Sequence, residues 1–285
     1  MTATAPAAAP AGVKSSNFFL GFLFLSPDRR RALTDVYAYC RLIDDIVDEG
    51  LPKTEAAAQL DFWTEEIARL YAGAPTHAVA KALLPHVKAL SLPREGFLEM
   101  IRGCRMDLDG ARYETLEQLE SYMRGVAGSV GALSVRIFGY HHTSQAEIDG
   151  FARDFGYAFQ LTNIIRDVGA DLELGRVYLP DADMRAAGYS RERLLARESG
   201  PAFERLMRVQ YDRAKAYYRR ARAAVDLRDR PSLLPAEVMA HIYEGLLDQI
   251  ARDDFQVLFK KNRLGPLKKA GFAAKAWLYC HGIHV

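Results

Sequence analysis

Two short acidic motifs carry the side chains of this sequence that could do chemistry. The later one reads QLTNIIRDVGAD and spans residues 160–171. Its polar residues are three, four and four positions apart, so a helix would place them on one face. They are Gln160, Asn163, Asp167 and Asp171. Two carboxylates and two carboxamides opposite an apolar face are more typical of a binding site than of a solvated surface.

The earlier motif, YAYCRLIDDIVDEG, spans residues 37–50. Asp44 and Asp48 are four residues apart and share a helical face, whereas Asp45 points elsewhere. Arg41 precedes Asp44 by one turn on the same side. The sequence therefore predicts two apolar helices, each with a D-x-x-x-D pair and a cationic residue close by.

Carboxylate pairs on two facing helices could hold hard divalent cations. Mg²⁺ usually takes one or two protein carboxylates, and substrate phosphates and water complete its octahedron. Arginines beside such a site could bind the phosphate oxygens that the metal leaves free; the candidates are Arg41, Arg166 and Arg176. Gln160 and Asn163 could donate hydrogen bonds to a diphosphate without adding charge.

Other interpretations of the acidic motifs are simpler. A single D-x-x-x-D pair is most often a solvated helix face. Two pairs in otherwise apolar helices favour a site. A di-iron carboxylate bundle requires Glu-x-x-His pairs, and no glutamate here has a histidine three residues later. That metal centre is therefore excluded.

Helical periodicity of apolar residues runs through almost the whole chain and predicts the elements that would position the motifs. The predicted helices span residues 27–49, 54–72, 76–91, 94–107, 114–139, 144–171, 201–225, 233–253 and 265–280. Glycine and proline separate them, and alternating β patterns are absent. Small residues in the central helices, such as Gly125, Gly128 and Gly156, would allow close packing. The expected fold is one all-α domain.

Composition excludes several classes of protein. The 285 residues include 38 basic and 36 acidic ones, so no global charge points to nucleic acid. Three widely spaced cysteines predict neither a disulfide framework nor a metal site and favour a reducing cytoplasm. Residues 1–13 are predicted to be a disordered tail. The apolar run Phe18–Leu25 is far below the ~20 residues that span a bilayer, which leaves peripheral membrane contact open.

Four segments resemble one family of enzymes. YAYCRLIDDIVDE, YMRGVAGSVG, FQLTNIIRDVGAD and GRVYLP, in this order, are similar to squalene and phytoene synthases. These synthases join two prenyl diphosphates head to head. The resemblance covers residues 14–270. SSNFFLGFLFLSPDRRRAL, GALSVRIFGY and FQVLFKKNRLGPLKK resemble most the bacterial presqualene diphosphate synthases of hopanoid biosynthesis.

The resemblance implies a fold, a metal and a set of site residues. Residues 14–285 would form an isoprenoid synthase helical bundle around a central apolar cavity. Asp44, Asp48, Asp167 and Asp171 would bind Mg²⁺, for which Mn²⁺ could substitute. The residues near the diphosphates would be Ser15, Ser16, Arg41, Gln160, Asn163, Arg166, Arg176, Tyr243, Lys260 and Lys268.

Two of these assignments have simpler alternatives. Phe18, Phe19 and Phe22 would line the cavity, although core packing explains aromatic residues at this spacing equally well. Taken without the resemblance, the stretch KKNRLGPLKK is most often a solvated basic end.

One position departs from the family pattern. Many relatives carry Tyr-Cys-x-Tyr before Val-Ala-Gly, whereas this chain has Tyr122-Met123-Arg124-Gly125. The second tyrosine, which is associated with the chemistry of squalene synthases, is replaced by Gly125. This fits a presqualene-type enzyme better than a complete squalene synthase. Tyr122 remains, either as a catalytic base or as a wall of the cavity.

The implied activity is condensation of two farnesyl diphosphates to presqualene diphosphate with loss of pyrophosphate, which is itself a candidate base. Reductive opening to squalene would need NADPH, and the chain has no G-x-G-x-x-G motif. The alternatives are a synthase of squalene, dehydrosqualene or phytoene, and a non-catalytic prenyl-lipid-binding protein. Expected partners are farnesyl diphosphate, the membrane surface and downstream isoprenoid enzymes, but no nucleic acid.

Overall fold

The computed structural model describes residues 18–283, which contain helices, turns and loops and no strand. The helices are α1 (Phe18–Phe22), α2 (Pro27–Asp48), α3 (Lys53–Tyr71), α4 (Ala78–Ala89), α5 (Arg94–Leu108), α6 (Leu116–Met123), α7 (Ser129–Phe138), α8 (Gln145–Glu173), α9 (Asp181–Ala186), α10 (Arg191–Leu195), α11 (Pro201–Ala223), α12 (Leu234–Arg252) and α13 (Pro266–Cys280). The prediction of a single all-α domain is confirmed. The predicted tail, 1–13, lies outside the described residues.

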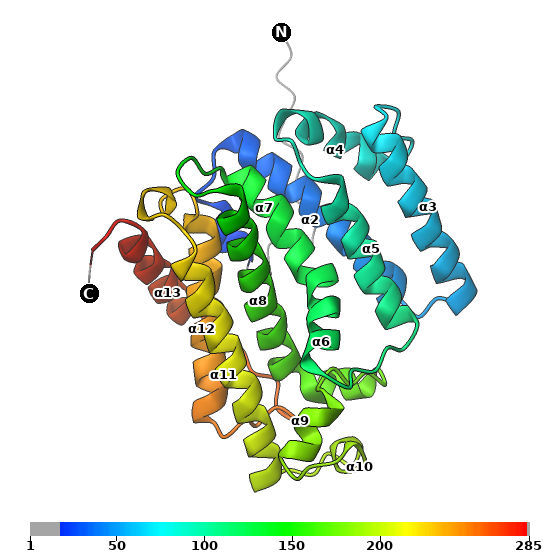
Figure 1. Ribbon diagram of the computed structural model, residues 1–285, viewed down its shortest axis with the longest axis vertical. Coiled ribbons are helices and arrows are strands. Elements are labelled where there is room, and N and C mark those ends of the chain that lie inside the picture. The colour runs from blue at the N-terminus through cyan, green and yellow to red at the C-terminus, as the bar shows by residue number, and fades with distance from the viewer. Residues whose placement is uncertain (1–17, 284–285) are drawn as a thin grey trace.

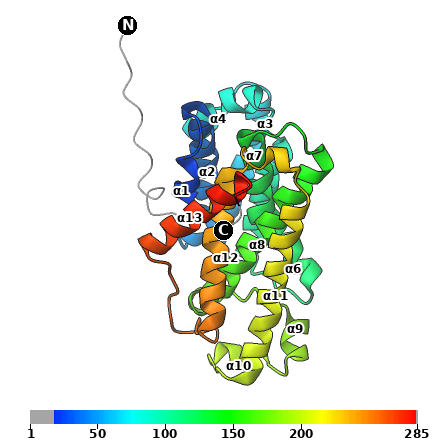
Figure 2. The same ribbon diagram turned by 90° about the vertical axis from the view of Figure 1, so that its left-hand side faces the viewer.

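Helix α8 lies in the middle of the bundle (Figure 1). It packs against α11 and α12 on one side and against α6 and α7 on the other. Helices α2 and α5 pack on α7, and α3 and α4 cover the edge beyond them. Helix α13 lies on the outside of α12 at the opposite edge (Figure 2). Each helix among residues 18–283 is too short or too polar to span a lipid bilayer.

Local sequence explains where the two motif-bearing helices begin and end. Ser144 caps α8 in a capping box with Glu147, which satisfies two free backbone N–H groups. Pro27 occupies the first turn of α2, where its missing N–H costs nothing. Gly50, at a φ of 72°, lets the chain turn just beyond α2. Both acidic motifs fall in the last turns of these helices.

The helix predicted over 114–139 is interrupted, and this prediction was wrong in detail. It begins as α6, passes through a π-helical turn at Arg124–Gly128 and continues as α7. Glycines at the turn allow backbones to touch. A Cβ added to Gly125 would lie 2.7 Å from the Cα of Gly103 on α5, and one added to Gly156 on α8 would lie 2.7 Å from the backbone N of Gly128. The predicted role of small residues in close packing is confirmed.

Candidate active site

A polar cavity of about 330 Å³ lies between the last turns of α2 and those of α8. Both acidic motifs face it. Its wall contains the predicted site residues Arg41, Asp44, Asp48, Tyr122, Gln160, Asn163, Arg166, Asp167, Asp171 and Arg176. The tertiary structure thus brings together side chains from α2, α6, α8 and the loop that follows α8.

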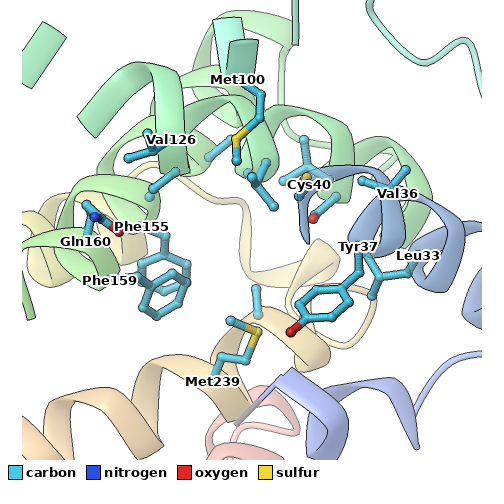
Figure 3. Close-up of a pocket in the computed structure, with 18 of the residues that line it drawn as sticks. Leu33, Val36, Tyr37, Cys40, Met100, Val126, Phe155, Phe159, Gln160 and Met239 are labelled. Atoms are coloured by element: carbon cyan, nitrogen blue, oxygen red, sulfur yellow. The ribbon is translucent and has the colours of Figure 1, made fainter. Parts of the chain in front are cut away.

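An apolar cavity of about 240 Å³ adjoins the polar one. Figure 3 shows Phe155 and Phe159 of α8 across this cavity from Leu33 and Tyr37 of α2. The two cavities share the wall residues Arg41, Asp44, Val126, Gln160 and Asn163. Charge is therefore gathered at one end of an otherwise hydrocarbon-lined space, as a prenyl diphosphate would require.

One acid of each pair has an arginine partner. On α2, Asp48 accepts a hydrogen bond from Arg176 at 2.8 Å. On α8, Asp167 accepts one from the neighbouring Arg166 at 2.8 Å. Arg176 follows α8, and its backbone N–H donates to the carbonyl of Asp171 at 2.8 Å. Arg176 therefore links the end of α8 to the end of α2.

The other acid of each pair, Asp44 on α2 and Asp171 on α8, forms no ion pair within the described part of the chain. Burial raises the pKa of Asp44 to about 7, against a hydrogen bond that its carboxylate accepts from the thiol of Cys104 at 3.4 Å. Burial also raises the pKa of Asp171 to about 7, and the nearby charge of Asp167 adds to the effect. Nearby arginines, Arg41 for Asp44 and Arg176 for Asp171, lower the two pKa values, but they do not offset the effect of burial.

A further acid, Asp107 of α5, lies in the wall of the polar cavity and was missed from the sequence. It accepts hydrogen bonds of 2.8 Å from the hydroxyls of Tyr122 and Tyr178. Burial raises its pKa, and these two hydrogen bonds oppose that rise. A single acid near a helix end has no distinguishing spacing, so the sequence offered no signal for it.

Arg41 and the two carboxamides take positions that the sequence defined only in part. Arg41, which the sequence placed one turn before Asp44, lines the polar cavity and pairs with Asp45 at 2.9 Å. Asn163 donates to Gln160 at 3.4 Å. The Oδ1 atom of Asn163 is buried and has no hydrogen-bond partner among the described residues. A buried acceptor left open in this way points to a ligand.

The remaining predicted residues lie elsewhere. Tyr243 of α12 lines the apolar cavity, and its side chain interacts with Arg166 by hydrogen bonding. Lys260 pairs with Asp253, and Lys268 donates to Gln249 at 2.9 Å. Neither lysine lines the polar or the apolar cavity.

Part of the predicted set falls where the structure gives no side chains. Ser15 and Ser16 lie outside the described residues, as do the side chains of Phe18 and Phe19. Phe22 is buried and lines the apolar cavity. All three cysteines are buried free thiols.

The donor set fits Mg²⁺ held jointly with a phosphate ligand. Between residues 18 and 283, no three Asp, Glu, His or Cys side chains lie close enough to form a complete metal site. Mg²⁺ does not need one, because it is usually bound through one or two carboxylates plus substrate phosphates and water. Two acid pairs facing one cavity, with the open Oδ1 of Asn163 nearby, match that pattern.

Comparison with known proteins identifies the family to which this chain belongs. The profile of the squalene/phytoene synthase family matches residues 12–268. The 15-cis-phytoene synthase of Synechocystis sp. is 33% identical over 277 residues, covering 93% of this chain and 81% of that protein. The chloroplastic phytoene synthase 1 of Arabidopsis thaliana is also 33% identical, over 90% of this chain and only 61% of its own length. The chain thus spans about three fifths of the plant relative.

Solved structures show the same fold. A dehydrosqualene synthase in complex with ligand has a TM-score of 0.83 and 27% identity, and covers 94% of this chain and 93% of that one. A squalene synthase, HpnC, from Alicyclobacillus acidocaldarius has a TM-score of 0.74 and 31% identity, covering 84% of this chain and 89% of that one. These relatives differ in product but share one type of reaction. The chain belongs to the squalene/phytoene synthase family, whose enzymes condense prenyl diphosphates head to head.

Proposed function

We propose that this enzyme joins two molecules of farnesyl diphosphate and releases presqualene diphosphate and pyrophosphate. We choose presqualene diphosphate as the product because of the close contact between Gly125 and Gly103. Relatives of the Tyr-Cys-x-Tyr type have a tyrosine where this chain has Gly125. Here a Cβ at that position would meet the Cα of Gly103 at 2.7 Å and the carbonyl oxygen of Glu99 at 3.0 Å. Because these are backbone atoms, this backbone has no room for the tyrosine. The absence of the tyrosine supports release of presqualene diphosphate over its further conversion to squalene.

The cavity walls explain how the chain would guide the reaction. The C1–O bond of one farnesyl diphosphate breaks, and the 2,3-alkene of the second substrate attacks the allylic C1. Leu33, Phe155 and Phe159 would surround the hydrocarbon chains and keep water from the cation. Arg166 and Arg176, at the polar end, would hold the diphosphates and fix the direction of cleavage. Mg²⁺ bound by the four aspartates would supply Lewis-acid stabilisation of the leaving group.

C2 of the second substrate bonds to C1 of the first and leaves a cation at C3. Closure of the cyclopropane then requires loss of a proton from C1 of the first substrate, and the electrons of that C–H bond form the bond from C1 to C3. Burial, together with the charge of Asp107, raises the pKa of Tyr122 well above its usual value. Its hydroxyl also donates to Asp107 at 2.8 Å. A neutral phenol in this position is a poor base, so we assign Tyr122 to the cavity wall. The departing pyrophosphate would take the proton.

A second candidate, synthesis of phytoene from two geranylgeranyl diphosphates, is supported by the 33% identity to phytoene synthases. The same arrangement of acids and arginines would serve both reactions, since the diphosphate is common to the two substrates. The two activities differ in the length of the prenyl chain and in whether the cyclopropane is opened.

Product analysis separates the candidates. The purified protein is incubated with farnesyl or geranylgeranyl diphosphate and Mg²⁺, with and without NADPH, and products are identified by mass spectrometry before and after phosphatase treatment. Presqualene alcohol that appears only after phosphatase, regardless of NADPH, supports the proposal. Squalene formed only with NADPH, or phytoene formed from the longer substrate, would overturn it. Substrate binding without pyrophosphate release would identify a non-catalytic prenyl-lipid-binding protein.

A further inference from the structure

The C-terminal part of the chain concentrates positive charge. Residues 255–283 contain no acid and six basic side chains, which are Lys260, Lys261, Arg263, Lys268, Lys269 and Lys275. The chain as a whole has a net charge of only +2, from 38 basic and 36 acidic residues. The six charges are therefore a local feature of this segment. We call these side chains, together with the outward face of α13, the C-terminal basic surface.

Most of the exposed residues of α13 are apolar. These apolar residues follow helical spacing, and they are Leu267, Ala270, Gly271, Ala274 and Trp277. Leu267 is 90% exposed and Trp277 is 41% exposed. Lys268 and Lys275, seven residues or about two turns apart, border this face. An amphipathic helix normally turns mainly polar residues to solvent, so this exposed apolar strip with lysines along its border is unusual.

The inner face of α13 fixes the helix to the protein. Ala276 and Cys280 are buried, and the ring of Phe272 occupies the space beside Gly245 of α12, where even a Cβ would be too close. Figure 2 shows α13 lying across the outside of α12. Helix α12 in turn lines the apolar cavity through Met239 and Tyr243. The outward residues of α13 are thus held in place on a rigid support one helix away from the cavity.

Most of the basic side chains are available to a partner. Lys260 pairs with Asp253. Lys261, Arg263 and Lys275 are exposed, Lys269 is half-buried, and none of the four forms an ion pair with any residue that the structure describes. Exposed cations that flank an apolar face with a tryptophan are the features of segments that lie in the headgroup region of a bilayer.

We propose that the C-terminal basic surface docks the enzyme onto a lipid bilayer that contains anionic headgroups. Leu267 and Trp277 would enter the boundary between headgroups and acyl chains, and the lysines would contact the lipid phosphates. Charge complementarity favours an anionic bilayer over a second copy of the chain, because two basic surfaces would repel each other. A bilayer is also favoured over nucleic acid, because nucleic acid would leave the outward side chain of Leu267 without an apolar contact.

Tryptophan fluorescence tests the proposal directly. The chain has two tryptophans, and Trp63 is only 3% exposed, so a change on membrane binding would report Trp277. The full-length protein is mixed with phosphatidylcholine vesicles, either pure or with about a third phosphatidylglycerol, and bound protein is separated by flotation. We expect binding to the anionic vesicles only, weakened by salt, with a blue shift and quenching by brominated acyl chains.

Matched charge reversals locate the surface. Lys261→Glu/Lys275→Glu changes the net charge by the same amount as Lys81→Glu/Lys88→Glu, which alters exposed lysines of α4 at the other edge of the bundle (Figure 1). The first variant should bind anionic vesicles about 25-fold more weakly or worse, at roughly fivefold for each cation lost, and the α4 variant within about threefold of wild type. Leu267→Ser, at a fully solvated position, should reduce lipid quenching of Trp277 without changing the thermal midpoint.

Three results would overturn the proposal: equal weakening by both reversals, no flotation with anionic vesicles, and flotation without any change at Trp277. Formation of dimers that Leu267→Ser abolishes would assign the face to a second copy instead. Turnover of farnesyl diphosphate in detergent is measured for every variant. Because none of these substitutions lies in the polar or apolar cavity, a loss of vesicle binding with unchanged turnover separates this inference from the proposed function.

Discussion

The acid pairs of α2 and α8 have the same kinds of ionic partner, but the partners come from different places in the chain. Each has one carboxylate held by an arginine and one without an ionic partner. On α2 the partnered acid is the later one, Asp48, and its arginine comes from beyond α8. On α8 the partnered acid is the earlier one, Asp167, and its arginine is its own neighbour. The α2 pair therefore depends on the tertiary fold for its counter-ion, whereas the α8 pair carries its own.

The difference between the partnered and the unpartnered acids indicates how the site could bind a cationic cofactor. The arginines keep Asp48 and Asp167 in place. Asp44 and Asp171, whose pKa values burial raises to about 7, have no direct ion pair, and the arginines near them offset the effect of burial only in part. In the free protein, ionisation of these two buried carboxylates raises the electrostatic free energy of the folded state. Binding of a cationic ligand lowers that free energy again.

The largest expected effect comes from removing an unpartnered acid. Asp44→Asn or Asp171→Asn should lower turnover by about 10³-fold, because each removes a charge from the leaving-group end of the site. Either change should also raise the free energy of unfolding at pH 8 by about 1–2 kcal/mol, since a buried charge disappears. Product assays and thermal unfolding measure the two effects. Asp149→Asn, an exposed position on α8, is the control and should change neither.

The partnered acids provide the contrast. Asp48→Asn and Asp167→Asn should also lower turnover by orders of magnitude, but they leave Arg176 or Arg166 without its carboxylate and should not raise the thermal midpoint. If all four substitutions stabilise the protein equally, the distinction between partnered and unpartnered acids is wrong. Clear unfolding of Asp44→Asn or Asp171→Asn would mean that these acids are structural.

Removing the link between the two helices should have the next largest effect. Arg176→Gln breaks the contact with Asp48 and removes a cation from the polar cavity, so we expect kcat/KM to fall about 10- to 100-fold. Arg176→Lys keeps the charge but not the planar geometry and should recover part of the loss. Steady-state kinetics with both variants gives the comparison. Equal activity of the two would show that the charge is unimportant.

A smaller effect is expected at Tyr122. Tyr122→Phe removes one of the two donors to Asp107 and should lower turnover about 10-fold or less if the phenol is a wall and not the base. Tyr113 stacks on Tyr178 of the same cluster, but its buried hydroxyl has no partner among the described residues. Tyr113→Phe is therefore a matched control that should leave turnover and stability unchanged or slightly improved. A loss of several orders of magnitude for Tyr122→Phe would restore the role of a base.

The smallest expected effect is the response of the metal-free protein to pH. The pKa of Asp44 and of Asp171 is about 7 in the folded state and about 4 in the unfolded chain. The folded state thus binds more protons between these values, and the resulting stabilisation, full below about pH 4, is lost as the pH rises to 7. The thermal midpoint should be a few degrees lower at pH 8 than at pH 5.5.

Two controls accompany the pH measurement. The double variant Asp44→Asn/Asp171→Asn should lose most of this pH dependence. Mg²⁺ with pyrophosphate should raise the midpoint of the wild-type protein at pH 8, because the ligands bind the folded state only. A midpoint that rises from pH 5.5 to pH 8 without ligands would show that the two acids are already ionised.

Much of the helical framework was predictable because it depends on residues close in sequence. Apolar spacing located the long helices to within a few residues, as with α2, predicted at 27–49 and observed at Pro27–Asp48. The four-residue spacing placed both acids of each motif on one helical face by geometry alone. The π-helical turn at Arg124–Gly128 has no distinguishing pattern in the sequence, and it lies where Gly125 touches the backbone of α5.

What the sequence by itself determined is therefore the content of each helix face, including which acids and carboxamides could act together. The tertiary structure decided which residues from different helices meet. It placed Asp107 between two tyrosines, turned Arg41 toward Asp45, brought Arg176 to Asp48 and held Lys260 and Lys268 away from both cavities. The physical reason is that helical geometry repeats every few residues, whereas contacts between distant segments depend on how whole helices pack against one another.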